Sequence, residues 1–312
     1  MFYIASNDPN GGIYECELLG NELSVLGLAK CSQPMYLAIN ERRLYAVLFA
    51  PFRGSNESAI TSFEIDDDGL LGESTGIVPT NGVSVCHLHI GQDVYVVNYS
   101  SGNVVLLPNK VVSHSGSSIH PTRQTGPHTH MITPTPDGKF LAVCDLGLDK
   151  IIVYDKLLNK ISEVQMPLGH GPRHITFSKC GCYAYCANEL ESTVSSLEYK
   201  DGVLTLIDTV ESITPEQKPT NLAAAIRLCG DKLYVSHRGV DVISEFLVDG
   251  PKLTHLRQIP CYGKAPRDFI VHNGLLICTN EKSNNVTIVD IKTEALLSEL
   301  KDISAPLCVI EG

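Results

Sequence analysis

The 312-residue sequence predicts an all-β fold, a seven-bladed β-propeller, and three observations support this prediction. Six stretches share one pattern, in which a turn residue, an alternating apolar strand, a polar turn and a second apolar strand follow one another. The repeats start 40 to 50 residues apart, which is the period of a four-stranded propeller blade. The two ends of the chain each supply part of a seventh unit.

The repeats can be placed one by one along the chain. In order, they cover residues 33–49, 82–99, 126–146, 171–190, 218–239 and 265–282. A third strand follows most of them, as in "KIIVYD" and "NVTIVDI". A fourth strand follows Asp201-Gly202 and Asp249-Gly250, since Asp-Gly between two strands is a strong hairpin signal. The period-two patterning and the many β-branched residues exclude a helical solenoid.

The chain termini predict how the ring closes. Residues 305–312 supply one strand, and residues 1–30 supply three strands without an opening strand. We expect the C-terminal strand to pair with the N-terminal ones, because this completes the last blade and removes two sheet edges. Residues 1–312 contain no linker or low-complexity segment, so we expect a single domain.

Composition narrows the classes of partner. The formal net charge is −11 and no basic patch is visible, which argues against nucleic acid as a partner. An anionic substrate would have to be attracted by local arginines against this overall charge. The N-terminal residues do not resemble a signal peptide, and no run of 18 apolar residues is present, so we expect a cytoplasmic protein without membrane contact. None of the 11 cysteines forms a CxxC pair, which indicates reduced thiols.

Polar side chains recur where each repeat's inner strand starts and where its second strand ends. Because inner strands surround the channel of a propeller, we expect these side chains to meet at one mouth of the channel. At the inner-strand starts stand His87, His89, His128, His130, Arg173, Asn221 and Arg267. At the second-strand ends stand Asn98, Tyr99, Asp145, Asn188, Glu189, His237, Arg238, Asn280 and Glu281. Strand alternation places His174 on the face opposite Arg173.

Other kinds of site find less support. The two His-x-His pairs are spaced like metal ligands, but carboxylate or thiolate co-ligands are missing at convincing spacing, so we expect neither a metal nor a cofactor. There is no Gly-rich phosphate loop and no GxSxG nucleophile motif. His89 and His174 alternate with apolar residues and could be hydrogen-bonded structural histidines. The arginine after Gly-Pro, Arg173, could form a salt bridge between blades.

Three stretches resemble a known family. They are "PHTHMITPTPDGKFLAVCDLGLDKIIVYD" (127–155), "GPRHITFSKCGCYAYCANEL" (171–190) and "YVSHRGVDVISEF" (234–246). They are similar to the seven-bladed propeller type of 6-phosphogluconolactonases, whose superfamily includes the carboxy-cis,cis-muconate cyclases. The resemblance implies an active-site set of His130 (or its neighbour His128), Arg173, Glu189 and Arg238. His237 stands where the family commonly has Asn.

The resemblance implies a metal-independent lactonase whose partner is a small anionic substrate, most simply 6-phosphogluconolactone. Glu189 or His130 would activate water, and Arg173 and Arg238 would stabilise the oxyanion and hold the phosphate. Further substrate contacts are expected from His87, His128, Asp145, Asn188, His237 and Asn280. Three alternatives stay open, namely a muconate-type cyclising enzyme, a non-catalytic binding propeller and a six-bladed calcium-dependent lactonase, which the repeat count disfavours.

Overall fold

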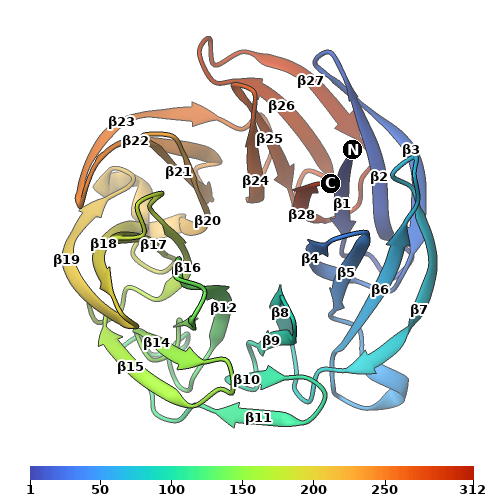
Figure 1. Ribbon diagram of the computed structural model, residues 1–312. Helices are drawn as coiled ribbons and strands as arrows, with labels where there is room; N and C mark the ends of the chain where they lie inside the picture. The colour runs from blue at the N-terminus through green and yellow to red at the C-terminus, as the bar shows by residue number, and fades with distance from the viewer.

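Seven four-stranded antiparallel sheets surround a central axis in the computed structural model, which describes residues 1–312 (Figure 1). The predicted seven-bladed β-propeller is therefore confirmed. Blade 1 has the strand order β28-β1-β2-β3, and blades 2 to 7 each take four consecutive strands, from β4–β7 to β24–β27. In every blade the strand that opens the predicted repeat lies nearest the axis.

Two strands form the inner half of each blade. The innermost strands are β4 (Pro34–Asn40), β8 (Val85–Ile90), β12 (Thr129–Pro134), β16 (Pro172–Phe177), β20 (Leu222–Cys229), β24 (Pro266–His272) and β28 (Pro306–Glu311). The second strands are β1 (Phe2–Ser6), β5 (Arg43–Leu48), β9 (Val94–Asn98), β13 (Phe140–Asp145), β17 (Tyr183–Asn188), β21 (Lys232–Arg238) and β25 (Leu275–Asn280).

The outer half of each blade is built in the same way. The third strands are β2 (Gly12–Leu19), β6 (Ala59–Ile65), β10 (Asn103–Leu106), β14 (Lys150–Asp155), β18 (Thr193–Lys200), β22 (Val242–Asp249) and β26 (Asn285–Asp290). The fourth strands are β3 (Glu22–Lys30), β7 (Leu71–Pro79), β11 (Lys110–Ser113), β15 (Lys160–Gln165), β19 (Val203–Glu211), β23 (Lys252–Pro260) and β27 (Leu296–Lys301). Two short 3₁₀ turns, η1 (Phe52–Gly54) and η2 (Pro215–Thr220), interrupt the connections. None of the helical segments has the length and apolarity that crossing a membrane requires.

The core lies between neighbouring blades rather than within one sheet. Alternate side chains of each strand face the next blade, and they form apolar clusters such as the one that joins blades 4 and 5 around Ile151, Ile175 and Leu197. A second cluster joins blades 1 and 7 around Ile4, Ile288 and Val309. Because these clusters fix each blade against its neighbours, the inner ends of the strands are held in place around the axis.

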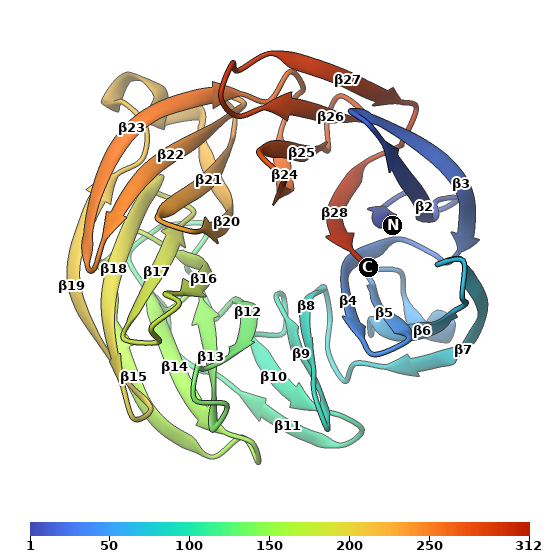
Figure 2. The ribbon, with the colours of Figure 1, turned by 45° about the horizontal axis from the view of Figure 1, so that its top comes forward.

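The ring closes through the two termini, which lie side by side in Figure 2. Strand β28 pairs antiparallel with β1, with Ile4 opposite Val309 and Phe2 opposite Glu311. The expected pairing of the C-terminal strand with the N-terminal strands is confirmed. It gives the C-terminal strand β28 a partner and covers the edge of β1 that would otherwise be open.

Deleting residues 306–312 is expected to destroy the cooperative unfolding transition. The deletion removes β28 with buried Leu307, Cys308 and Val309. Burial of the Leu and Val side chains alone is worth about 1.5–3 kcal/mol each, and the pairing of β28 with β1 is lost as well. The sum approaches the whole stability of an ordinary domain. Thermal denaturation followed by circular dichroism checks this, with deletion of exposed Gly312 alone as the control. An unchanged melting temperature after the longer deletion would contradict closure of the ring by β28.

Candidate active site

One cavity of about 320 Å³ opens beside the axis at one mouth of the channel. It lies among the inner ends of blades 2 to 7 and contains a concentration of arginines unusual for a chain of net charge −11. We call it the main cavity. Its lining residues are Met35, Phe49, Ser84, Cys86, Tyr99, Arg123, His130, Glu189, Arg238 and Arg267.

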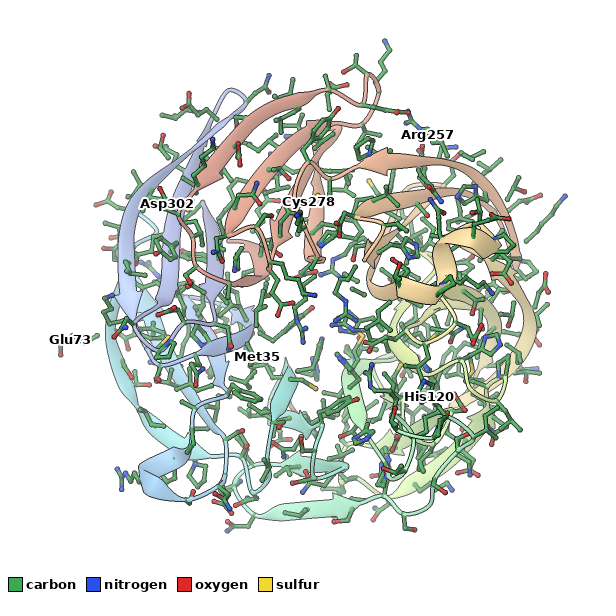
Figure 3. The ribbon with its side chains drawn as sticks, turned by 180° about the vertical axis from the view of Figure 1, so that it is seen from behind. Met35, Glu73, His120, Arg257, Cys278 and Asp302 are labelled. Carbon is green, nitrogen blue, oxygen red and sulfur yellow. The ribbon has the colours of Figure 1, made fainter.

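All seven inner strands shift register at a β-bulge, and in six of them the bulge directs one residue toward the axis. The bulged residue has no partner on the second strand, because the register shifts by one position there. The bulged residues are Met35, Cys86, His130, Arg173, Arg267 and Leu307. All six line a small cavity of about 10 Å³ on the axis, and four of them also line the main cavity. In Figure 3 Met35 accordingly lies near the centre of the ring, whereas Glu73 of β7 projects from the rim.

Glu189 is the centre of the site's ion pairs. It follows β17 directly, and its side chain is only 3% exposed. Its Oε1 accepts a hydrogen bond of 2.5 Å from Arg123, and its Oε2 lies 2.8 Å from Arg238 Nη2. The same Oε2 lies 3.0 Å from Nε of Arg173. One buried carboxylate thus holds three guanidinium groups, from the connection before blade 4 and from blades 5 and 6.

The charges of this cluster are strongly coupled. Burial alone would raise the pKa of Glu189, but the neighbouring guanidinium groups, Arg238 and Arg173 foremost, outweigh burial and hold its pKa well below the usual range. Burial and the nearby charge of Arg238 lower the pKa of Arg173 to about 9, in spite of Glu189. Glu189 is therefore ionised at physiological pH and is a weak base. With Arg267 also present, the cationic groups outnumber the carboxylate and favour binding of an anion.

His130 is the neutral imidazole of the cluster and the candidate proton acceptor at the main cavity. It is buried at the edge of the main cavity, and its Nδ1 has no hydrogen-bond partner. Burial, reinforced by Arg173, holds the pKa of His130 well below 6.5, so the imidazole is neutral. Glu189 acts in the opposite direction and favours the protonated form. If His130 took up a proton, the negative charge of Glu189 would therefore stabilise the resulting imidazolium.

The four residues of the expected active-site set, His130, Arg173, Glu189 and Arg238, come together. They reach this point from the inner strands of blades 4 and 5 and from the second-strand ends of blades 5 and 6. Arg173 is the most enclosed of the four and lines the small axial cavity rather than the main one. His130, Glu189 and Arg238 line the main cavity directly.

The expectation that His174 faces away from Arg173 is wrong. Arg173 is the bulged residue of β16, and a bulge breaks the simple alternation of side chains along a strand. Nη1 of Arg173 lies 3.2 Å from Nε2 of His174, within hydrogen-bond distance. The His174 ring also packs edge-on against the rings of His130 and His87, with centroids 5.4 Å and 5.7 Å apart. His174 and His87 therefore lie beneath the site, and His87 does not line the main cavity.

Asn188 and Asn280 do not line the main cavity either. With Asn98 they end the second strands of their blades and are fully buried. Each amide donates a hydrogen bond of 2.8 to 3.1 Å to a side chain on the third strand of its own blade. These hydrogen bonds fix the end of each second strand, where the chain turns at the mouth of the channel. The residue after each asparagine is the one whose side chain lines a cavity. These next residues are Tyr99, Glu189 and Glu281.

Asp145, His128 and His237 also lie outside the main cavity. Asp145 accepts a hydrogen bond of 2.8 Å from the backbone of His128 and contacts His114 Nδ1 at 2.6 Å, so it anchors both ends of the connection 114–128. The His128 ring stacks on Tyr99, with centroids 4.3 Å apart. His237 lies 3.0 Å from the Asn221 amide and is buried in blade 6. These side chains therefore contact residues around the site but do not line the main cavity themselves.

Arg123 is a site residue that the repeat pattern could not indicate. It lies in the connection 114–128, the longest between two blades, and has no counterpart in other repeats. Its side chain is 33% exposed. The guanidinium group donates a hydrogen bond of 3.2 Å to Tyr99 Oη and another to Glu189. The one signal in the sequence is the length of this connection, because long structured loops in compact folds are often functional.

The side chains of the site are not arranged as a set of metal ligands. No group of three or more His, Cys, Asp or Glu side chains is arranged to hold a metal ion. The two rings of each His-x-His pair have different neighbours. His130 lines the small axial cavity while His128 stacks on Tyr99, and His87 packs against His174 while His89 stacks on Tyr95.

Comparison with known proteins agrees with this architecture. The family described as "Lactonase, 7-bladed beta-propeller" matches residues 1–310. The uncharacterized protein YwcC of Lactococcus lactis is 33% identical over 318 residues, covering 93% of this chain and 91% of the relative. A Bacteroides fragilis protein named as a candidate 6-phosphogluconolactonase is 27% identical, with a TM-score of 0.87 and coverage of 99% and 97%. The periplasmic gluconolactonase PpgL of Pseudomonas aeruginosa is 25% identical, with a TM-score of 0.85 and 99% of both chains covered. This chain belongs to the seven-bladed β-propeller lactonase family.

Proposed function

We propose that the protein hydrolyses the lactone of a sugar acid, and that its substrate is 6-phosphogluconolactone. The observation that carries the proposal is the cluster at the main cavity, where Glu189 holds three guanidinium groups beside the neutral His130. A cavity of about 320 Å³ is at the lower end of the range for small-molecule sites and suits a single sugar ring. The name of the Bacteroides relative supports this substrate, and the name of the Pseudomonas relative supports hydrolysis of a sugar-acid lactone.

His130 acts as the general base in this proposal. Water attacks the lactone carbonyl carbon, His130 accepts a proton from that water, and the tetrahedral intermediate then breaks the ring C–O bond. The departing alkoxide takes the proton back from His130, so the base is regenerated. Glu189 stabilises the imidazolium formed in between, because its charge already favours protonation of His130.

The oxyanion of the tetrahedral intermediate is held by Arg238, which lines the main cavity. Arg267 also lines this cavity and is available for another anionic group of the substrate, because its closest acidic partner is Glu281 at 3.5 Å. Charge developing on oxygen inside a partly buried site is stabilised strongly by such preorganised donors. Arg173 lies deeper and serves to position Glu189.

A panel of lactones is expected to identify the activity. The wild-type protein should accelerate the opening of 6-phosphogluconolactone at pH 7, and a metal chelator should leave the rate unchanged, because every step above uses side chains of this chain. Titration of the released acid in a pH-stat measures both rates against the spontaneous reaction.

Two results would contradict the proposal. Lack of acceleration with every lactone would favour a binding propeller, and turnover of a muconate-type diacid instead would favour the cyclising reaction. Loss of activity with the chelator would show that a metal takes part.

A further inference from the structure

A second cavity of about 580 Å³ adjoins the main cavity between blades 6 and 7. We call it the outer cavity. It shares Arg238 and Arg267 with the main cavity, so the two form one continuous hollow. Its lining residues are Thr220, Leu222, Arg238, Gly239, Asp241, Lys264, Ala265, Arg267, Glu281 and Lys282.

Two lysines of the outer cavity are held next to each other by their backbones. The amide of Lys282 donates a hydrogen bond of 3.0 Å to the carbonyl of Lys264, and the amide of Lys264 donates one of 2.7 Å to Ser283 Oγ. A third bond of 3.1 Å joins the Glu281 amide to the carbonyl of Ala265. The connection before β24 and the turn after β25 therefore form one braced unit that carries both ammonium groups.

The acidic groups nearby do not neutralise these lysines. Neither Lys264 nor Lys282 forms an ion pair in the structure, whereas other exposed lysines such as Lys160 and Lys301 do. The Asp241 carboxylate accepts hydrogen bonds from backbone amides, including that of Ala265 at 2.8 Å. Both lysines line the same cavity, and an anion bound in it is attracted by both positive charges.

The lactone itself explains why a second anion site would adjoin the first. In a 6-phosphorylated δ-lactone the carbonyl carbon and the carbon that carries the phosphate arm both flank the ring oxygen. The phosphate stands at the end of a CH₂–O arm, so it projects beyond the ring and lies several bonds from the carbonyl, where an adjoining cavity can receive it. Arg173 and Arg238 are already within 3.0 Å of Glu189, which leaves them poorly placed to grip a phosphate as well. Arg267 lies at the boundary between the two cavities.

We infer that Lys264, Lys282 and Arg267 form an anion subsite that binds the substrate's phosphate while the lactone ring occupies the main cavity. This inference rests on the proposed function and adds the residues that select phosphorylated over unphosphorylated lactones. Lysine ammonium groups bind phosphate as point charges, and Arg267 adds a planar donor pair. The subsite also draws an anionic substrate toward an otherwise acidic protein.

The test compares two substrates in one double variant. Lys264→Gln combined with Lys282→Gln is expected to lower the ratio of kcat/KM for 6-phosphogluconolactone to that for glucono-δ-lactone at least tenfold. Lys200→Gln combined with Lys252→Gln is the matched control, since both of these lysines are exposed on outer strands away from the cavities. A ratio unchanged from the wild type would overturn the inference, as would an equal change in the control.

A binding measurement separates this inference from the proposed function. Calorimetry with 6-phosphogluconate and with gluconate needs no turnover, and the wild-type protein should bind the phosphorylated acid at least tenfold more tightly. The Lys264/Lys282 double variant should lose this preference. Equal binding of the two acids by the wild-type protein would overturn the subsite, even if lactones are hydrolysed. Absence of lactone hydrolysis together with the phosphate preference would overturn only the proposed reaction.

Discussion

Replacing Glu189 with glutamine is expected to lower kcat/KM for lactone hydrolysis at least tenfold and to lower the free energy of unfolding by about 3–5 kcal/mol, the cost of breaking a buried ion pair. The substitution keeps the shape of the side chain but leaves three neighbouring guanidinium groups without their shared carboxylate. Initial rates and urea unfolding measure the two effects. Glu198→Gln, in the same blade but exposed and without an ion pair, should change neither.

The stability effect of Glu189 should depend on pH in a defined direction. Its folded-state pKa is held below the value of about 4.3 for an unperturbed glutamate. The stabilisation is therefore fully present above about pH 4.3 and is lost as the pH falls toward the folded-state pKa. The difference in unfolding free energy between the wild type and Glu189→Gln should shrink below pH 4. A difference that grows with acidity would contradict the assigned charge of Glu189.

Replacing His130 with asparagine is expected to lower kcat by about 10²–10⁴-fold, the usual contribution of general acid–base catalysis. The KM should change much less, because binding depends on the arginines and not on this ring. Since the pKa of His130 lies well below 6.5, kcat of the wild type should show no inflection near pH 6.5. Steady-state kinetics between pH 5.5 and 8 checks both expectations, with exposed His255→Asn as the control. An inflection at the ordinary histidine pKa, lost in His130→Asn, would show that water reaches this ring and that it is not held neutral by burial.

The fold is predictable because its signals are repeated. Each of the six repeats has the same strand–turn–strand order and predicts one blade. A strand that is hard to recognise in one repeat can be placed from the equivalent position in the others. The ring closure is predictable for a different reason, since Pro306 opens a repeat that only the N-terminal strands can complete. Neither inference requires knowledge of any single side chain's direction.

The site is predictable only where the residue types are unusual. Arg173, Glu189 and Arg238 can be found because charged residues stand at repeat positions that are mostly apolar or amide elsewhere. Side-chain direction cannot be predicted at the bulges, so strand alternation places His174 on the wrong face. Asn188 and Glu189 are adjacent in sequence, yet one braces the blade and the other reaches the cavity.

The loop contribution to the site is not predictable from repeats at all. Arg123 lies in a connection that has no equivalent in other blades, and its role depends on the anchoring of that connection by Asp145. The position of Asp145 in the repeat predicts a contact with substrate. Its actual partners are the Leu148 amide in its own blade and two residues of the connection 114–128, whose path the repeat pattern does not constrain.

The central claim is that Glu189 and His130 act as one unit in opening a lactone, and a double-mutant cycle tests it most directly. We would measure kcat/KM for 6-phosphogluconolactone in the wild type, in Glu189→Gln, in His130→Asn and in the combined variant. Groups that act on the same step lose their effects together, so the combined variant should be no slower than the slower single variant. Losses that multiply, or a wild-type rate equal to the spontaneous one, would contradict the claim.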